Sequence, residues 1–543
     1  MNSENIIKAL KLTGKLMELH SENPFKIKSL NNAVFKLDKT NVDLGSATLQ
    51  ELEKMEGIGK GIAGKIDELQ RTGELQELNA LCAKTPAGVI GLFEIRGLGP
   101  KKIWQLWKEL NVESMGELLY ACYENRLVTL KGFGAKTQEA VKKAIEFTQK
   151  STGKFHYAKV EKYAFALVGL LKKILNTDKV SLTGPVRRKC EILEQIDILV
   201  VSESIPALPE IQDAPDIRVN IINCPDLNFY SMLFETTASA EHLIQINYKP
   251  SGATVQIQPA LSEENIYASL EMQYIEPELR EGLNEVDLAL SNGLPRLIEF
   301  SDLKGILHNH TTWSDGSDTL KEMAVHCKEL GYQYLGICDH SQSAFYANGL
   351  KPDRVAEQQK EIEELNKQMI PFRIFKGIES DILNDGSLDY KEEILKTFDF
   401  IVASVHSNLK MDQEKATLRL IRAIENPYTT ILGHPTGRLL LSREGYPIDH
   451  QKVIDACAAN GVVIELNAHP YRLDMDWRWL YYCQSKGVRI SINPDAHSKQ
   501  GYHDMYYGVC AARKGMLTKE MCLNSLSCEE IKNFFNLRKI GPS

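Results

Sequence analysis

Nine histidine and carboxylate side chains after residue 300 have the types and spacing of metal ligands. His308 and His310 follow a short apolar run, and residues two apart on a strand project from the same face. The other seven stand at or near the ends of further apolar runs: Asp315, His340, Glu379, His406, His434, Asp495 and His497. Imidazoles and carboxylates suit zinc, manganese or iron. Nine ligands exceed what one ion can use, so we expect two or three divalent ions, which together can activate water and hold a phosphate.

The elements that must position these residues are short strands alternating with helices. Apolar runs occur at 334–338, 400–403, 430–432, 462–466 and 489–492, with helical segments between them. This alternation predicts a parallel sheet closed as a barrel, whose site lies at the carboxyl ends of the strands. The other histidines of this region are interpreted as ordinary loop or core residues: His326, His450, His469 and His503.

The motifs around these ligands resemble the polymerase-and-histidinol-phosphatase (PHP) superfamily. They are His308-Asn309-His310, Ser314-Asp315-Gly316, Asp339-His340, Gly377-Ile378-Glu379, Ser404-Val405-His406-Ser407, Gly433-His434-Pro435 and Asp495-Ala496-His497. The resemblance implies a (β/α)7 barrel that holds up to three metals. It places His308, His310, Glu379 and Asp495 on one ion, His406 and His434 with Glu379 on a second, and Asp315, His340 and His497 on a third.

Catalytic roles in this domain are expected for Asp315 and His340. Arg438 is a candidate to pair with a phosphate, with ordinary salt bridging as an equal alternative.

Three glycine turns near the N-terminus indicate DNA binding. Each places two glycines before a new helix, with lysines close by: Gly57, Gly59 and Lys60; Gly97, Gly99, Lys101 and Lys102; Gly132, Gly134 and Lys136. A helix N-terminus offers free N–H groups to a phosphate, and a lysine adds charge. This helix-hairpin-helix arrangement grips the DNA backbone without reading its sequence.

The run 57–77 resembles the lyase domain of family X DNA polymerases. The resemblance implies that Lys65 attacks an abasic sugar to form a Schiff base. Leu30-Asn31 stands where the family usually has Tyr-Arg, so we favour a solvated helix lysine as the alternative.

Residues 155–300 resemble the family X palm and the connector that precedes the PHP domain. The motif Gly184-Pro185-Val186-Arg187-Arg188 precedes Asp197, the strand Arg218-Val219-Asn220 follows, and the connector covers 274–281. Polymerases of this type hold two magnesium ions with three aspartates, but here Gln195 and Asn220 occupy two of those positions.

Two further departures fall in the same palm pocket. Pro185 replaces a serine, and Thr236-Thr237-Ala238-Ser239 replaces Phe-Thr-Gly-Ser. We therefore expect templated synthesis to be lost or vestigial, and magnesium to be needed only if the palm is active.

Composition and charge are those of an ordinary globular protein. Hydrophobic residues make up 43% of the 543-residue chain and charged residues 25%. Residues 1–150 hold 22 Lys and Arg against 19 Asp and Glu, whereas 151–300 hold 13 against 21. Any DNA affinity should therefore be local and lie in the first third. Scattered cysteines without a CxxC pair, and the lack of an apolar leader or spanning run, predict a cytoplasmic location without membrane contact.

The expected fold is multidomain: an all-α helix-hairpin-helix N-terminal region, an α+β nucleotidyltransferase-like palm and thumb, and a C-terminal (β/α)7 PHP barrel. The predicted domains are 1–80, lyase-like and DNA-binding; 81–152, fingers-like helix-hairpin-helix; 153–230, palm; 231–302, thumb-like region and linker; and 303–543, PHP metallo-phosphoesterase.

The expected function is DNA repair or processing at gapped, nicked or 3′-end substrates. It would be carried out by a monomer with metal-dependent 3′–5′ exonuclease or phosphoesterase activity. The alternatives are an active gap-filling DNA polymerase with PHP proofreading and a non-catalytic scaffold that binds DNA ends. A small-molecule phosphatase is disfavoured, because a free metabolite has no use for three backbone clamps.

Overall fold

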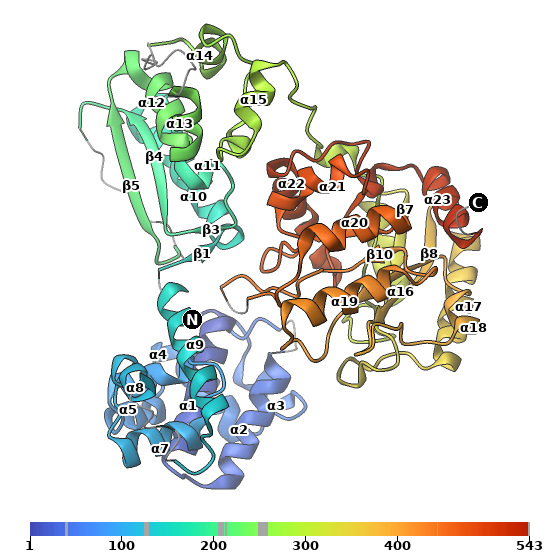
Figure 1. Ribbon diagram of the computed structural model, residues 1–543. Coiled ribbons are helices and arrows are strands. Elements are labelled where there is room, and N and C mark those ends of the chain that lie inside the picture. The colour runs from blue at the N-terminus through green and yellow to red at the C-terminus, as the bar shows by residue number, and fades with distance from the viewer. Residues whose placement is uncertain are drawn as a thin grey trace. The chain divides into compact units, whose positions relative to one another are not determined.

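The structure, a computed structural model, describes residues 1–38, 42–123, 127, 130–151, 153–204, 211, 214–247, 259–441 and 444–540. The chain divides into two compact units, Met1–Thr152 and Gly153–Ser543, and each is described by itself (Figure 1). In the part of the chain that the structure describes, no helix has the length and apolar character needed to cross a membrane.

The first unit is built from helices, as its apolar spacing predicts. Its core is one cluster to which α1 contributes the fully buried Ile6, Leu10 and Leu16. The helices are α1 (Ser3–Leu19), α2 (Pro24–Leu37), α3 (Leu49–Lys54), α4 (Lys60–Thr72), α5 (Gln76–Ala83), α6 (Ala87–Gly91), α7 (Pro100–Leu110), α8 (Met115–Tyr123) and α9 (Ala135–Ser151).

The second unit begins with a small α+β region. Strand β4 (Gln195–Val201) pairs antiparallel with β2 (Val180–Thr183) and parallel with β5 (Arg218–Cys224), while β1 (Phe155–His156) pairs with β3 (Ile192–Leu193). The helices here are α10 (Tyr157–Leu175), α11 (Gly184–Arg187), α12 (Phe229–Thr237), α13 (Ala240–Asn247), α14 (Glu263–Ser269) and α15 (Glu285–Leu290). The register places Asp197 beside Asn220, so the predicted palm residues share one end of this sheet.

The rest of the second unit is a parallel barrel of seven strands. In sheet order they are β6 (Gly305–Ile306), β7 (Tyr334–Ile337), β8 (Arg373–Asp381), β9 (Phe400–Ser404), β10 (Ile431–Leu432), β11 (Val463–Asn467) and β12 (Ile490–Asn493). A parallel bridge between Asn309 and Ala496 joins the two edges of the sheet. The helical N-terminal region and the (β/α)7 barrel of the expected fold are thus confirmed.

Helices surround the barrel strands in the yellow, orange and red part of Figure 1. They are α16 (Leu320–Glu329), α17 (Pro352–Gln368), α18 (Glu392–Leu395), α19 (Gln413–Ile424), α20 (His450–Asn460), α21 (Leu480–Ser485), α22 (Met505–Lys514) and α23 (Cys528–Ile540). Fully buried side chains such as Ile337, Ile401 and Ile464 pack between strands and helices, so the strand ends are held rigidly.

Candidate metal centre

The nine predicted ligands meet at one end of the barrel. His308 and His310 follow β6, His340 follows β7, Glu379 lies in β8, and the rest follow later strands: His406, His434, Asp495 and His497. Asp315 comes from the turn after His310. This end carries the carboxyl termini of parallel strands, where barrels assemble their sites.

The carboxylate of Glu379, which is 1% exposed, lies at the middle of the group. One oxygen, Oε1, is 3.0 Å from His434 Nε2, 3.1 Å from His406 Nε2 and 3.2 Å from His308 Nε2. The other oxygen is 3.0 Å from His340 Nδ1. Ligands about 2.1 Å from a tetrahedral ion lie roughly 3.4 Å from one another, so this spacing suits a shared cation.

Two further carboxylates, those of Asp495 and Asp315, also lie close to histidines of the group. Asp495 Oδ1 lies 3.0 Å from His310 Nε2 and 3.6 Å from His308 Nε2. Asp315 Oδ1 lies 3.4 Å from His497 Nε2 and 3.7 Å from His340 Nε2.

Three sets of ligand atoms emerge, each close enough to hold one ion. They are His308, His310 and Asp495; His340, Glu379 and His406; and His310, Asp315, His340 and His497. These sets overlap the expected grouping but differ from it in three ways. His310 and His340 each belong to two sets, Glu379 is absent from the set of His308, and His434 belongs to none of them, although its Nε2 lies 3.0 Å from Glu379.

Several buried atoms of this group fit metal coordination because the protein leaves them without hydrogen bonds. His308 Nε2, His310 Nδ1 and Glu379 Oε2 are inaccessible to solvent and make no hydrogen bond to any residue that the structure describes. Burying such atoms unpaired is costly, and coordination to a cation would satisfy them. His308 and Asp495 also adopt left-handed backbone angles, with φ of 57° and 52°, a strain that is common at functional sites.

Burial and neighbouring charges shift the pKa values in opposite directions. Burial alone would raise the pKa of Glu379, but His406, His308 and His340 hold it well below its usual range. Burial alone would lower the pKa of His406, but Glu379 and Asp381 raise it to about 10. Burial, with help from His497 and His340, lowers the pKa of His310 to about 3. The centre is therefore strongly anionic and attracts positive charge, and His310 is neutral as a ligand must be.

Two carboxylates in an outer layer orient the ligand imidazoles. Glu465, fully buried in β11, accepts a hydrogen bond from His308 Nδ1 at 2.7 Å and another from the backbone N–H of His434 at 3.1 Å. Asp381 accepts from His406 Nδ1 at 2.5 Å. Such partners fix which ring nitrogen faces the metal and raise its basicity.

A third outer carboxylate, Asp339, fixes the turn that carries Asp315. Asp339 is fully buried and accepts hydrogen bonds from Thr311, Ser314 and Gln358. No role was expected for Glu465, Asp381 or Asp339 from the sequence alone. Their signal in the sequence is an acidic residue inside, or directly after, an otherwise apolar strand.

Arg438 is engaged within the protein. Its guanidinium donates to Asp476 and to the carbonyl oxygens of Arg472 and Leu473, so it holds the loop after β11 in place. Arg472 differs, because its Nη1 is buried and has no hydrogen-bond partner among the residues that the structure describes. Burial, together with the charge of Arg472, lowers the pKa of His434, so this guanidinium interacts electrostatically with one of the predicted ligand imidazoles.

In the palm, both amides that replace the expected acids donate to the remaining one. Gln195 Nε2 lies 2.7 Å and Asn220 Nδ2 lies 2.8 Å from Asp197 Oδ1. Gly184 leaves room for the Asp197 carboxylate, because a Cβ at position 184 would lie 2.8 Å from Asp197 Oδ2. Amide hydrogens therefore satisfy Asp197 Oδ1, an oxygen that would otherwise be available to a magnesium ion.

The palm arginines are engaged by carboxylates as well. Arg187 pairs with Glu263 and donates to Thr237, while Arg188 pairs with Glu281 at 3.0 Å. Burial alone would raise the pKa of Glu281, but Lys514 and Arg188 hold it below its usual value. Neither arginine is free to bind a triphosphate unless an internal ion pair breaks first.

The three glycine turns of the first unit share one geometry. Gly57, Gly97 and Gly132 have φ values of 87°, 88° and 88°, which favour glycine. The N–H of the next residue donates three positions back in each turn.

The second glycine of each turn leaves its surroundings open. A Cβ at Gly59, Gly99 or Gly134 would meet no atom within 4 Å, so a phosphate has room at the start of the following helix. The lysines at these helix starts are exposed: Lys60, Lys101 and Lys136. Lys102 of the second turn extends over the ring of Phe133 in the third, at 5.5 Å from its centroid, so these two turns are neighbours.

Lys65, the predicted lyase nucleophile, lies on α4 and forms an ion pair with Glu77. Leu30 is 2% exposed and belongs to the core. The lyase hypothesis stays a prediction, and this ion pair supports the alternative of a helix lysine without a catalytic role.

Comparison with known proteins places the chain in a family. Residues 1–75 match the helix-hairpin-helix domain family and residues 307–469 match the PHP domain family. The DNA polymerase/3′-5′ exonuclease PolX of Bacillus subtilis is 34% identical over 98% of this chain and 99% of its own length. The chain belongs to the PolX group of family X DNA polymerases with a PHP domain. This confirms the resemblance inferred from the motifs, while the individual domain boundaries stay predictions.

More distant relatives match the PHP region. A probable phosphatase of Thermoanaerobacter sp. (strain X514) is 29% identical over 44% of this chain and 98% of its own length. A solved histidinol phosphate phosphatase from Lactococcus lactis, in complex with zinc, L-histidinol and phosphate, matches 39% of this chain and 93% of that chain. Its sequence identity is 19% and its TM-score is 0.32.

Replacing Glu465 by glutamine tests the outer layer. The substitution keeps the size but removes the charge that orients His308, so the affinity for Mn²⁺ should fall about 10- to 100-fold. Titration calorimetry of the full chain measures this, with the exposed Glu425→Gln as the matched control. Equal Mn²⁺ affinity in both variants would show that Glu465 only fills space.

Proposed function

We propose that this PolX family member processes DNA ends by metal-dependent phosphodiester hydrolysis in its PHP domain, as a 3′–5′ exonuclease or a related phosphoesterase. The observation that carries the proposal is the convergence of three carboxylates and six imidazoles at one barrel mouth, with buried ligand atoms left unpaired. Zinc, manganese or iron would suit these ligands. When bound, such ions would lower the pKa of water and stabilise the attacking and leaving oxygens during displacement at a phosphate.

The chain's own residues divide the remaining tasks. Glu379, Asp495 and their histidines hold the positive charge, and Glu465 and Asp381 keep the imidazoles oriented. Asp315, whose side chain is 35% exposed, lies at the solvent side with His497 and His340. We infer that Asp315 exchanges a proton with the leaving oxygen, because its side chain is the most exposed of the three ligand carboxylates. His340, 8% exposed and 3.7 Å from Asp315, would assist this transfer by orienting the carboxylate.

The glycine turns supply DNA affinity by binding backbone phosphates at three helix starts. This accounts for a hydrolase domain being joined to a DNA-binding region of balanced charge. Gapped, nicked or 3′-end DNA would be the substrate class, and a monomer would suffice because the nine ligands come from one chain.

The palm is proposed to lack polymerase activity. Asp197 is the one acid left of three, and two amide groups bind it. An amide cannot accept the proton of a primer hydroxyl, and one carboxylate cannot neutralise two magnesium ions.

Removal of metal or of one ligand tests the hydrolase. Chelator-treated protein should release no mononucleotide from a labelled oligonucleotide. Added Mn²⁺ or Zn²⁺ should restore release in the wild type but not in His308→Ala, since that variant loses a ligand of the first ion. Product analysis on denaturing gels follows the reaction. Undiminished release by His308→Ala would refute the assignment of this site.

Arg472 is expected to contact the phosphate being cleaved, in place of Arg438. A charge-assisted hydrogen bond contributes about 1.5–3 kcal/mol, so Arg472→Gln should lower kcat/KM for DNA about 10- to 150-fold while metal content stays normal. Arg478→Gln, on the same loop but 54% exposed at its side chain, is the matched control. Equal kcat/KM values for the two variants would leave Arg472 without this role.

Primer extension on a gapped duplex tests the palm. The wild type should add no nucleotide, and Asp197→Ala should not change that. Replacing both amides, Gln195→Asp with Asn220→Asp, should create Mg²⁺ binding that calorimetry detects in the His308→Ala background. Extension by the wild type that is lost in Asp197→Ala would contradict this proposal.

A further inference from the structure

The loop after β11 connects the metal centre with the palm. Asn467 Nδ2 donates to Asp495 Oδ2 at 3.1 Å, and the N–H of His469 donates to Asn467 Oδ1 at 3.1 Å. The N–H of Tyr471 then donates to His469 Nδ1 at 3.2 Å. Four residues span at most about 14 Å, so Tyr471 is near enough to contact the DNA strand that enters the centre.

Around Tyr471, side chains from the palm and the barrel gather. The His156 ring lies 4.2 Å from the Tyr471 ring and the His469 ring lies 5.3 Å from it, measured between centroids. Lys159 Nζ lies 5.6 Å from the centroid of the same ring. Tyr471 remains 37% exposed, and Lys159 is exposed and forms no ion pair with any residue that the structure describes. An aromatic surface with an available cation is thus open to solvent here.

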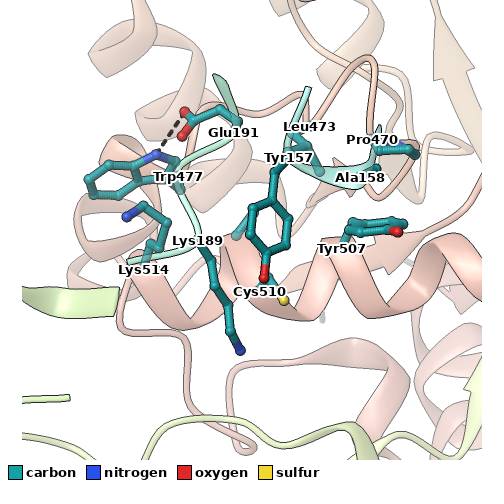
Figure 2. A pocket seen from close by; sticks show the side chains of 11 residues that line it. Tyr157, Ala158, Lys189, Glu191, Pro470, Leu473, Trp477, Tyr507, Cys510 and Lys514 are labelled. Carbon is teal, nitrogen blue, oxygen red and sulfur yellow. Dashed lines mark hydrogen bonds between the residues drawn. The ribbon is translucent and has the colours of Figure 1, made fainter. Parts of the chain in front are cut away.

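Close packing fixes the palm against this loop. Figure 2 shows Tyr157 and Ala158, at the start of α10, beside Pro470 and Leu473. The cavity that these residues line together with others has a volume of about 10 Å³, room for one water at most. His156 Nε2 is 3.0 Å from the carbonyl oxygen of Leu440, which strengthens the same contact. Because the loop and His156 are held in place, the aromatic rings are preorganised for a ligand.

We propose that His156, Lys159, His469 and Tyr471, here named the palm–barrel rim, bind the end of a single DNA strand during hydrolysis. A base stacks on the aromatic rings while Lys159 contacts a backbone phosphate. Stacking on aromatic side chains combined with basic groups is how proteins hold single strands regardless of sequence. The inference rests on the proposed phosphoesterase function and adds a substrate-binding role for the palm.

Removing the base from the substrate tests the stacking. Two 5′-labelled oligothymidines would be compared, one complete and one with abasic units at the end from which nucleotides are released. Tyr471→Ala should lower kcat/KM about 5- to 150-fold for the complete strand and little for the abasic one. Tyr471→Phe should keep the wild-type preference. Tyr481→Ala, which removes a tyrosine of similar exposure (43%) on α21, is the matched control.

A spectroscopic readout keeps this test separate from catalysis. Terminal 2-aminopurine in the same oligonucleotide should be quenched on binding chelator-treated wild type but not Tyr471→Ala. Lys159→Gln should reduce the slope of log affinity against log salt by about 0.7, since one phosphate contact is lost.

The outcomes separate the two proposals. Quenching without nucleotide release would refute the hydrolase and leave the rim standing. The rim alone would be refuted if Tyr471→Ala matched the wild type in three measurements. These are nucleotide release, 2-aminopurine quenching, and the relative use of abasic and complete strands. The rim would also be refuted if the preference for complete over abasic strands were lost in a variant of Phe345, which is 86% exposed, but kept in Tyr471→Ala. The base would then stack elsewhere.

Discussion

The carboxylate of Glu379, itself 1% exposed, is surrounded by the imidazoles of four histidines at about 3 Å. Such an arrangement is stable only if positive charge is shared among these groups. Protons can supply it in part, as the raised pKa of His406 indicates, but His310 is held neutral by burial. Divalent cations satisfy the carboxylates and the imidazole lone pairs together, so the site is built around an electrostatic demand that metal meets.

The barrel meets this demand through the two-residue period of its strands. Glu379 and Asp381 share a face of β8, so one reaches the centre and the other supports His406 from behind. Glu465 and Asn467 likewise share a face of β11, a strand for which no metal ligand was expected. Glu465 accepts a hydrogen bond from His308, and Asn467 donates one to Asp495. Every strand end thus contributes a ligand or a group that orients one, and the rigid apolar core behind them limits how far any can move.

Much of this organisation could be predicted from the sequence, because strand-end histidines and repeated glycine turns are local patterns. The seven-stranded barrel, the helical first unit and the family followed from them. The outer layer could not be predicted, since Glu465 and Asp339 look like isolated acids until distant strands are brought together. The sequence also left open whether Arg438 pairs with a phosphate or forms an ordinary salt bridge, because its partners in the structure lie more than thirty residues away. Likewise, the loss of charge at Gln195 and Asn220 was visible, but not that both would turn toward Asp197.

Those amides satisfy the carboxylate of Asp197 within the protein. A buried carboxylate that loses its cation must find other donors, and Gln195 and Asn220 provide them. On the side of the palm nearest the barrel, Lys514 of α22 is 3% exposed and donates to the carbonyl oxygens of Arg188 and Glu278 and to the carboxylate of Glu281. Removing the palm would leave that ammonium unpaired at the barrel surface. The palm-like region and the barrel therefore share buried charges that neither can satisfy alone, which favours retention of the palm-like region whether or not it synthesises DNA.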